Sequence, residues 1–335
     1  MSLVIGGYAT SPPDASPDAL TSYYAALLSI GFEKQSGGKH AVGLEIPLHA
    51  NGLLAQSPEQ EAALLRAISM FPGCRSVLTL VPGTMAQLST MPAFGLASSD
   101  ERGRNAALAF ARLACAGVER ITDAGGSIVG VEVHSAPRRA YGLNASGAAL
   151  TASLVEMASW DWKGAEIVVE HCDDANGPDP VKGFLPFAEE LEAVRDARAA
   201  VAGVRVGVTI NWARSVLETR DSATPLEQIM SAGTLLRGFI FSGCTGSVTP
   251  YGSPWQDIHC PWADVETTSM LTRKHIASIA NKIAASGAML LFAGVKVALQ
   301  PACDFDSASR VAVNKEMLAA VANALSEHVF VTGSN

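Results

Sequence analysis

The chain has 335 residues, of which 48% are hydrophobic and 17% charged, and its 24 Lys and Arg against 32 Asp and Glu leave a formal net charge of −8. So high a hydrophobic fraction excludes an intrinsically disordered chain, which combines low hydrophobicity with high net charge. The negative charge opposes binding to nucleic-acid phosphates, and no apolar run reaches the roughly 20 residues of a membrane-spanning helix. We therefore expect a globular protein with neither a nucleic-acid nor a membrane partner.

The amino-terminal segment and the cysteines indicate a cytoplasmic protein. The segment MSLVIGGYAT lacks the basic start of a signal peptide and is interpreted as a first strand. Scattered cysteines with no C-x-x-C pair are then typical of free thiols in a reducing compartment. The six are Cys74, Cys115, Cys172, Cys244, Cys260 and Cys303. Nothing in the composition opposes a homo-oligomer.

Short apolar runs recur along the chain. Each is rich in Val, Ile, Leu or Phe and ends in Gly, Pro, Ser, Asn or Asp, which is typical of strands buried on both faces. They cover residues 3–9, 41–48, 76–83, 128–137, 165–174, 205–215, 236–244 and 290–301.

Longer amphipathic segments alternate with these runs and predict helices. Two of them begin with Ser-Pro, at Ser16 and Ser57, which indicates a helix cap followed by proline in the first turn. The segments are 16–31, 57–70, 99–126, 144–161, 183–199, 224–233, 264–287 and 307–328.

Eight strand–helix units predict an α/β protein with parallel strands, and eight is the number that closes a (β/α)₈ TIM barrel. A doubly wound open sheet is the alternative, but no G-x-G-x-x-G follows the first strand, so we expect no nucleotide cofactor. No linker divides the chain, and we expect residues 1–335 to form a single TIM-barrel domain.

In such a barrel the active site lies at the carboxyl ends of the strands. Glu45, Glu132, Glu170 and Lys296 are charged residues within otherwise apolar strands. Because burying an unpaired charge costs several kcal/mol, they indicate either a functional site or an internal ion-pair network with Lys296 as its cation. Other polar residues follow the strands: His134, His171, Asn211, Arg214, Ser242, Asp257 and His259.

Aromatic and metal-binding residue types extend this prediction. Trp212, Trp255 and Trp262 are candidates for an aromatic wall against an apolar sugar face, whereas Trp160 and Trp162 at a helix end are expected in the core. Carboxylates and histidines that converge from different strands favour a divalent metal ion. A zinc site at Cys244, His259 and Cys260 is an alternative, although no regular spacing supports it.

The strand endings resemble those of the xylose-isomerase-like TIM-barrel superfamily, which contains sugar isomerases, epimerases and endonuclease IV. The similarity rests on G-x-E in the second strand, E-V-H in the fourth, E-H-C-D in the fifth, N-W-A-R-S in the sixth and D-x-H after the seventh. More narrowly, EVHSAPRRA, VVEHCDD, INWARSVLETR, FSGC, TPYG and GVKVALQPA together resemble a bacterial family of unknown function in that superfamily, over nearly the whole chain.

This resemblance implies an active site at the carboxyl ends of the strands and often a divalent metal. In the epimerases the metal lies between acidic residues of strands five and eight, an Asp of strand six and a His of strand seven. Glu170 matches the strand-five position, but Asn211, Ser242 and Lys296 stand at the other three. The endonuclease branch has a D-x-H after strand seven, which is similar to the one in this chain, together with further histidines that the chain lacks.

The resemblance therefore implies a metal site for Mn, Mg or Zn at Glu170, Asp257 and His259. Lys296 offers a second hypothesis, because its positive charge replaces a metal-bound carboxylate. It can stabilise an enediolate with Glu170 or Glu132 as the base, or form a Schiff base if burial keeps its amine neutral.

The leading hypothesis is an isomerase or epimerase of a small sugar or sugar derivative, which works by carboxylate acid/base proton transfer. The expected catalytic residues are Glu170, Glu132, His134 and Lys296, and the expected substrate-binding residues are Glu45, His171, Asn211, Trp212, Arg214, Ser242 and Trp255. The alternatives are a lyase or hydrolase that uses Lys296, and a non-catalytic sugar-binding barrel with a degenerate metal site. A DNA-repair nuclease is disfavoured by the charge of −8.

Overall fold

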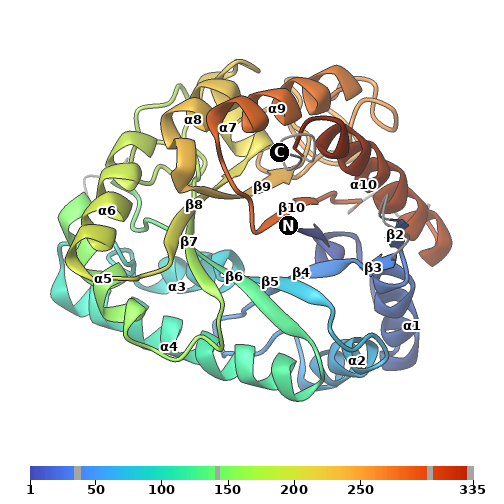
Figure 1. Ribbon diagram of the computed structural model, residues 1–335, viewed down its shortest axis with the longest axis horizontal. Helices are drawn as coiled ribbons and strands as arrows, with labels where there is room; N and C mark the ends of the chain where they lie inside the picture. Colours follow the sequence, from blue (N-terminus) through green and yellow to red (C-terminus); the bar gives the residue numbers. More distant parts are fainter. Residues whose placement is uncertain (34–38, 140–143, 300–304, 330–335) are drawn as a thin grey trace, which may run out of the picture.

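A computed structural model describes residues 1–33, 39–139, 144–299 and 305–329. Within these residues eight parallel strands close a barrel in the order β1-β10-β9-β8-β7-β6-β5-β4, which confirms the predicted fold (Figure 1). The strands are β1 (Ser2–Ile5), β4 (Gly43–Pro47), β5 (Arg75–Thr79), β6 (Ser127–Val133), β7 (Glu166–Glu170), β8 (Val206–Asn211), β9 (Leu236–Phe241) and β10 (Phe292–Val295).

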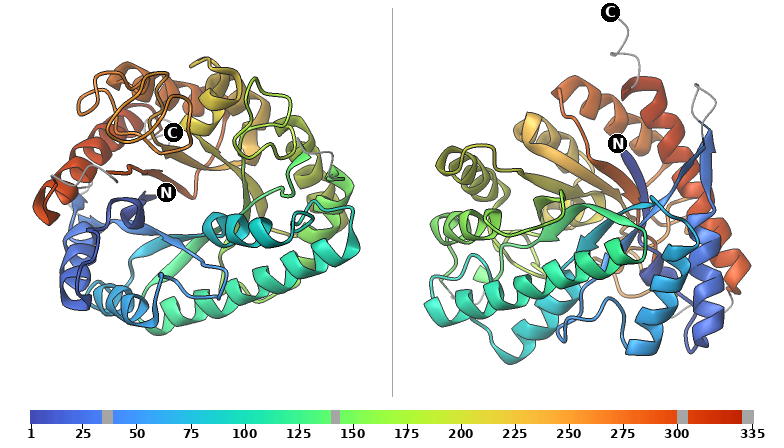
Figure 2. Two further views of the ribbon diagram at one scale, coloured as in Figure 1. Left: turned by 180° about the vertical axis from the view of Figure 1, so that it is seen from behind. Right: turned by 60° about the horizontal axis from the view of Figure 1, so that its bottom comes forward.

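Helices surround the barrel on its outside, as both views in Figure 2 show. Ser16 and Ser57 cap α1 and α2 by accepting hydrogen bonds from backbone N–H groups, as the Ser-Pro motifs predict. Within the described residues, no helix is long and apolar enough to span a bilayer. The helices are α1 (Pro17–Leu28), α2 (Pro58–Ser69), α3 (Val81–Thr90), α4 (Glu101–Asp123), α5 (Gly147–Ala158), α6 (Phe187–Ala200), α7 (Trp212–Thr219), α8 (Thr224–Ala232), α9 (Arg273–Ser286) and α10 (Ser307–Val329).

Two helices differ from the sequence-based expectation. The strands expected over 76–83 and 205–215 end at Thr79 and Asn211, and α3 and α7 begin almost directly behind them. Apolar residues continue across both junctions without a glycine, and a short apolar run does not separate a buried strand from a buried helix. The helix that begins at Trp212 matters for function, because it carries Arg214.

Smaller differences concern the loops. Strands β2 (Gly31–Glu33) and β3 (Lys39–Ala41) form an antiparallel pair that the sequence patterns did not predict. Helix α9 begins at Arg273, not at residue 264, because Thr272 caps it and the preceding residues belong to the long loop after β9. Helix α6 likewise begins at Phe187, four residues later than expected.

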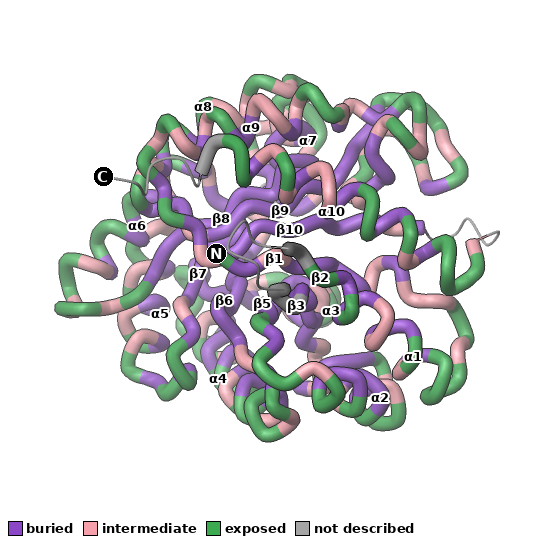
Figure 3. Tube along the Cα trace, turned by 45° about the vertical axis from the view of Figure 1, so that its right-hand side comes forward, coloured by how far each residue is buried: buried purple, intermediate pink, exposed green. Residues whose placement is uncertain are grey.

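The apolar core has two parts. The larger part lies between the strands and the surrounding helices, where the strands in Figure 3 are buried and the outer helix faces are exposed. A separate cluster fills the barrel interior and forms a floor beneath the carboxyl ends of the strands. It consists of Val4, Val77, Val129, Val168, Ile240 and Phe292.

Two glycines make room for the largest side chain of this floor. A Cβ atom at Gly238 would lie 2.2 Å from Cζ of Phe292, and one at Gly130 would lie 2.9 Å from its Cε1. Both distances are shorter than van der Waals contact, so the phenyl ring occupies the space that two side chains would otherwise take. The floor is therefore closed by one ring from β10 packed against bare backbone of β6 and β9.

We expect Gly238→Ala to lower the free energy of unfolding by about 1–3 kcal/mol, because the added methyl group overpacks the floor. Phe292→Leu should relieve the clash with the ring, though not the approach of 2.6 Å to Thr209 Oγ1, so the alanine should cost less in that background than in the wild type. Urea denaturation of both single variants and the double variant measures this coupling. Strictly additive effects would contradict this account of the floor.

Candidate active site

Charged side chains lie directly above the apolar floor. Alternate residues of a strand point to the same face, so Glu170 follows Val168 into the barrel interior, and Ser242 follows Ile240. The side chains of Glu45, Glu132 and Lys296 are also buried. The charged residues expected at a site therefore come together inside the barrel, at the carboxyl ends of the strands.

Glu170 is held by three neighbours. His134 Nε2 lies 2.8 Å from its Oε2, a guanidinium nitrogen of Arg214 lies 2.5 Å from its Oε1, and the Asn211 side-chain amide donates to Oε1 at 3.4 Å. Burial by itself would raise the pKa of Glu170, but the charge of Arg214 and the hydrogen bond from His134 outweigh it and hold the pKa well below its usual range. Glu170 is therefore an oriented carboxylate at neutral pH.

Arg214 also binds a second carboxylate. Its Nε donates to Asp257 Oδ2 at 3.1 Å, and the same oxygen forms an ion pair with Lys182. Burial opposes ionisation of Asp257, but the charges of Lys182 and Arg214 keep its pKa well below the ordinary value. Helix α7 thus brings one guanidinium between the carboxylates of β7 and of the loop after β9.

Lys296 forms the other side of the network. Its Nζ lies 2.6 Å from Glu45 Oε1 and 5.0 Å from the centre of the Tyr8 ring, and the Tyr8 hydroxyl donates to the same glutamate oxygen at 3.3 Å. Burial alone would lower the pKa of Lys296, but the charge of Glu45 overcomes it and raises the pKa above its ordinary value. Lys296 is therefore an ammonium ion at neutral pH, as the predicted alternative of an ion-pair network requires.

Burial raises the pKa of Glu45 as well, but Glu132 differs from the other carboxyl groups of the site in its hydrogen bonding. Its side chain is fully buried, and neither of its oxygens has a hydrogen-bond partner among the described residues. Burial, followed by the negative charges of Glu170 and Glu45, raises the pKa of Glu132 well above its ordinary value. Glu132 is therefore a neutral carboxylic acid beside an ionised one.

A hydrogen-bonded chain connects His259 to this centre. Ser242 Oγ donates to Asn211 Oδ1 at 2.7 Å, so the 3.3 Å contact between Ser242 Oγ and His259 Nδ1 uses the histidine as donor. Burial lowers the pKa of His259 well below its usual value, and the imidazole is neutral with Nε2 unprotonated. Its φ of 49° is left-handed and unusual for a side chain of this size, and a hydrogen bond from Ala298 N to its carbonyl holds this conformation.

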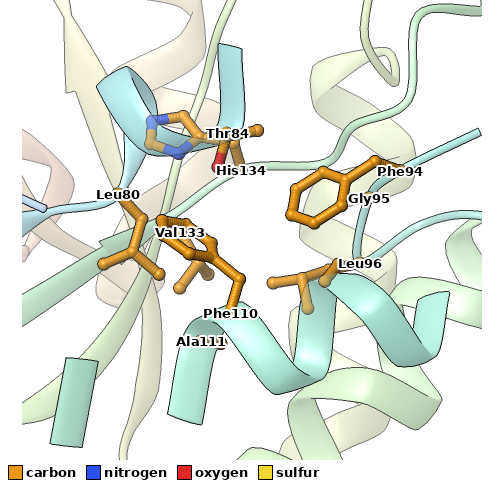
Figure 4. A pocket seen from close by; sticks show the side chains of 10 residues that line it. Leu80, Thr84, Phe94, Gly95, Leu96, Phe110, Ala111, Val133 and His134 are labelled. Atoms are coloured by element: carbon orange, nitrogen blue, oxygen red, sulfur yellow. The ribbon is translucent and has the colours of Figure 1, made fainter. Parts of the chain in front are cut away.

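His134 lies between this centre and a small cavity. A cavity of about 10 Å³ lies beside it, with room for about one water molecule. Figure 4 shows the His134 ring at this cavity together with Thr84, Phe94 and Phe110. Nε2 of His134 binds Glu170, and its Nδ1 has no hydrogen-bond partner among the described residues.

His171, which we expected to bind substrate, lies outside this network. Its Nδ1 lies 2.7 Å from Glu190 Oε2 on α6, and its Nε2 lies 2.6 Å from Glu218 Oε2 on α7. Burial lowers its pKa, but the two carboxylates outweigh this and raise the pKa of His171 to about 10. This imidazolium joins α6 and α7 to the end of β7, one residue after Glu170 in the sequence.

The tryptophans do not gather into an aromatic wall. Trp212 is fully buried with its ring centre 5.5 Å from that of His275, whereas Trp255 lies under Arg220 and Trp262 under Arg273. Trp160 and Trp162 are buried and pack against each other at 5.8 Å, as expected of core residues.

The residues predicted to hold a metal do not form one donor group. Both oxygens of Glu170 face His134 and Arg214, and Asp257 Oδ2 faces two cationic side chains. Within the residues described, no cluster of three or more His, Cys, Asp and Glu side chains is arranged to hold an ion. The donor set Glu170, Asp257 and His259 therefore does not fit a resident divalent metal, because the guanidinium of Arg214 lies between the two carboxylates.

The cysteines agree with the expectation of free thiols as far as the structure describes them. Cys74, Cys115, Cys172, Cys244 and Cys260 form no disulfide, and Cys303 lies outside the described residues. Burial raises the pKa of the Cys244 and Cys260 thiols, and within the described residues these cysteines belong to no cluster of ligands arranged to hold an ion, so the alternative zinc site is not supported.

Two residues of the site were not predicted from the sequence. Lys182 lies in the loop before α6 within an ordinary D-P-V-K-G segment, and Tyr8 follows the first strand by three residues. A signal for Tyr8 existed, because residues at the carboxyl end of a barrel strand are site candidates. Lys182 carries no such signal, since only the folded loop brings it to Asp257.

The fold belongs to a known class. The chain is similar to the crystal structure of a D-tagatose 3-epimerase-like protein, with a TM-score of 0.55 and 15% identity over 91% of this chain and 97% of that one. It is similar to a D-psicose 3-epimerase crystallised in the presence of D-fructose, with a TM-score of 0.56 and 15% identity over 100% of both chains. The IolI protein with a bound zinc atom gives a TM-score of 0.56 and 12% identity, over 98% of this chain and 99% of that one. This is the xylose-isomerase-like TIM barrel.

Within that class, a family described as a domain of unknown function (DUF4862) matches residues 4–313. An uncharacterised protein of Salmonella typhimurium (strain LT2) is 38% identical over 227 residues, which cover 66% of this chain and 69% of the relative. The chain belongs to this family of unknown function.

The buried imidazolium of His171 makes stability depend on pH. Because its folded-state pKa of about 10 exceeds the ordinary value of 6.5, its stabilisation is complete below about pH 6.5 and is lost as the pH rises through about 10. Removing one partner of a buried ion pair costs about 3–5 kcal/mol, so we expect His171→Gln to lower stability by that order at pH 7.

Chemical denaturation of the wild type and His171→Gln at several pH values from 7 to 11 measures this effect. The difference between the two proteins should shrink steadily as the pH rises from 7 to about 10, and it should level off above that pH. A difference that stays constant over this range is inconsistent with a charged His171.

Proposed function

We propose that the chain is an isomerase or epimerase of a small sugar or sugar derivative, with Glu132 and Glu170 as its acid and base. One observation carries the proposal: two carboxyl groups share the barrel interior, and their pKa values are shifted in opposite directions. Environments that separate two carboxyl pKa values in this way provide an acid and a base at the same pH.

The two groups suit proton transfer next to a carbonyl. The carboxylate of Glu170 removes a proton from the carbon beside the substrate carbonyl, and the electron pair of the C–H bond moves to the carbonyl oxygen to form an enediolate. Glu132 donates its proton to that oxygen. In the second half a proton is returned from Glu170 to the neighbouring carbon, which gives the isomer, or is delivered to the original carbon from the opposite face, which gives the epimer. The Glu132 carboxylate takes back a proton from an enediol hydroxyl as the carbonyl re-forms, so both residues regain their starting states. Arg214 and His134 keep Glu170 ionised and oriented.

Buried cations supply the positive charge that the developing oxyanion requires. Lys296 and Arg214 are both charged and buried within the network, where fixed charges act more strongly than in water. The proposed reaction therefore needs no metal ion.

The similar structures support this class of reaction, since one is named a D-psicose 3-epimerase and another a D-tagatose 3-epimerase-like protein. Aldol cleavage through a Schiff base is less well supported, because a Schiff base requires a neutral amine and the raised pKa of Lys296 keeps it protonated. A purely ligand-binding barrel does not explain why Glu132 is buried without a partner, at a cost in stability.

We expect Glu132→Gln to slow the reaction about 10²–10⁴-fold, the usual contribution of general acid catalysis. Stability should change by less than about 1 kcal/mol, because a neutral amide replaces a neutral acid of the same shape. Deuterium incorporation from D₂O into D-tagatose, D-psicose and D-fructose, followed by NMR, detects an enediolate whichever isomer is formed.

Glu156→Gln is the matched control, because Glu156 is an exposed glutamate on the outer helix α5. It should exchange deuterium at the wild-type rate. Glu170→Gln should abolish exchange, since an amide cannot act as the base. Wild-type rates in Glu132→Gln or Glu170→Gln would exclude the proposed roles.

We also expect activity and stability to be independent of divalent metals. Dialysis against EDTA should leave the melting temperature and the deuterium exchange unchanged, and elemental analysis should find far less than one Mn, Mg or Zn per chain. A stoichiometric metal whose removal lowers the melting temperature would overturn the metal-free mechanism.

A further inference from the structure

A second, larger pocket opens beside the charged network. It has a volume of about 340 Å³ and lies at the carboxyl ends of β1 and β4, with Tyr8, Tyr24, Pro47, His49 and Leu54 among its lining residues. This volume falls within the roughly 300–1,000 Å³ of small-molecule sites.

The pocket and the network share a wall. The ring of Tyr8 lines the pocket, while its hydroxyl donates to Glu45 and its face lies 5.0 Å from Lys296 Nζ. Pro47, which also lines the pocket, follows Glu45 by two residues on β4 and therefore points to the same face. A molecule in the pocket thus lies against the Glu45 side of the proposed catalytic centre.

Polar side chains of the pocket have unused hydrogen-bonding capacity. His49 and Gln60, which are half-buried, and Gln56, which is exposed, line it, and no hydrogen bond joins their side chains to another described residue. Each amide offers both donors and acceptors, which matches the hydroxyl groups of a sugar. The rings of Tyr8 and Tyr24 provide apolar surface for its C–H groups.

The charge of the lining disfavours an anion. None of the described residues that line the pocket is a lysine or arginine, whereas Asp14 contributes a carboxylate. Burial lowers the pKa of His49, so this imidazole is uncharged at neutral pH. A phosphate or carboxylate group would find no opposite charge here and would be repelled by Asp14.

The loop that carries His49 and Gln56 is held by side chains of two helices, Glu61 of α2 and Arg120 of α4. Glu61 Oε2 accepts a hydrogen bond from Leu54 N at 2.6 Å, and Arg120 forms an ion pair with Glu61 at 2.8 Å. Arg120 also donates to the carbonyl of Gly52 at 2.7 Å. These contacts fix the backbone of the loop that carries the polar side chains. Less conformational entropy is therefore lost when a ligand binds.

We propose that this pocket binds an uncharged monosaccharide, without a phosphate or carboxylate group, through His49, Gln56 and Gln60 and against the rings of Tyr8 and Tyr24. The proposal rests on the proposed function for one statement only, that the reacting carbons of the sugar lie at the end of the pocket next to Glu45, where the proposed catalytic centre begins. The binding site and its preference for neutral sugars follow from the lining itself.

Isothermal titration calorimetry tests the proposal with D-psicose, D-tagatose and D-fructose against D-fructose 6-phosphate and D-glucuronate. We expect at least one neutral ketose to bind, and the two anionic sugars to bind at least about tenfold more weakly. The double variant Gln56→Ala/Gln60→Ala should weaken binding of the neutral ketose by about tenfold or more, as loss of two hydrogen bonds implies. Gln87→Ala, on α3 and outside both pockets, is the matched control and should bind as the wild type does.

The proposal is overturned if none of the three ketoses binds, if either anionic sugar binds as tightly as the best ketose, or if the double variant binds like the wild type. Calorimetry reports binding without turnover, so the two proposals fail separately. Selective ketose binding that depends on Gln56 and Gln60, in a protein that exchanges no deuterium, would support the pocket and contradict the isomerase mechanism.

Discussion

The site depends on one buried guanidinium. Arg214 contacts Glu170 at 2.5 Å and Asp257 at 3.1 Å, and so it joins β7, α7 and the long loop after β9 in a region with almost no solvent exposure. Each of these carboxylates would be costly to bury alone, and the guanidinium would be costly without them. The ionisation of Glu170 and the position of the loop after β9 therefore have a common cause.

This arrangement differs from a metal centre in a definite way. A divalent ion collects carboxylates and imidazoles around one point, whereas here Lys182, Lys296 and Arg214 divide the carboxylates among themselves. The same pairing explains why Glu132 is different. The cations are engaged by Glu45, Glu170 and Asp257, so Glu132 faces like charges without a cation of its own and retains its proton. A buried carboxylic acid without a hydrogen-bond partner lowers stability, so a network selected for stability alone would not contain Glu132.

Much of the barrel was predictable from the sequence, and so was much of the charged centre. Buried parallel strands must be apolar, so a charge inside one, as at Glu45 or Glu170, is conspicuous without any structure. His171 shows where this reasoning fails. It is adjacent to Glu170 in sequence, but successive residues of a strand face opposite sides, and it binds helices α6 and α7. Its partners Glu190 and Glu218 are distant in sequence, and amphipathic helix patterns do not reveal them.

The sequence by itself determined the alternation of strands and helices, the closure of eight units into a barrel and the identity of most charged groups inside it. These follow from local properties, namely apolar runs, helix caps and the high cost of a buried charge. Only the tertiary structure decided which charges pair. The position of Lys182 beside Asp257, the start of α7 at Trp212 and the isolation of Glu132 depend on how loops and helices pack around the barrel. Ionisation states are set by distances between residues far apart in the chain, and so the chemistry of the site is a property of the fold.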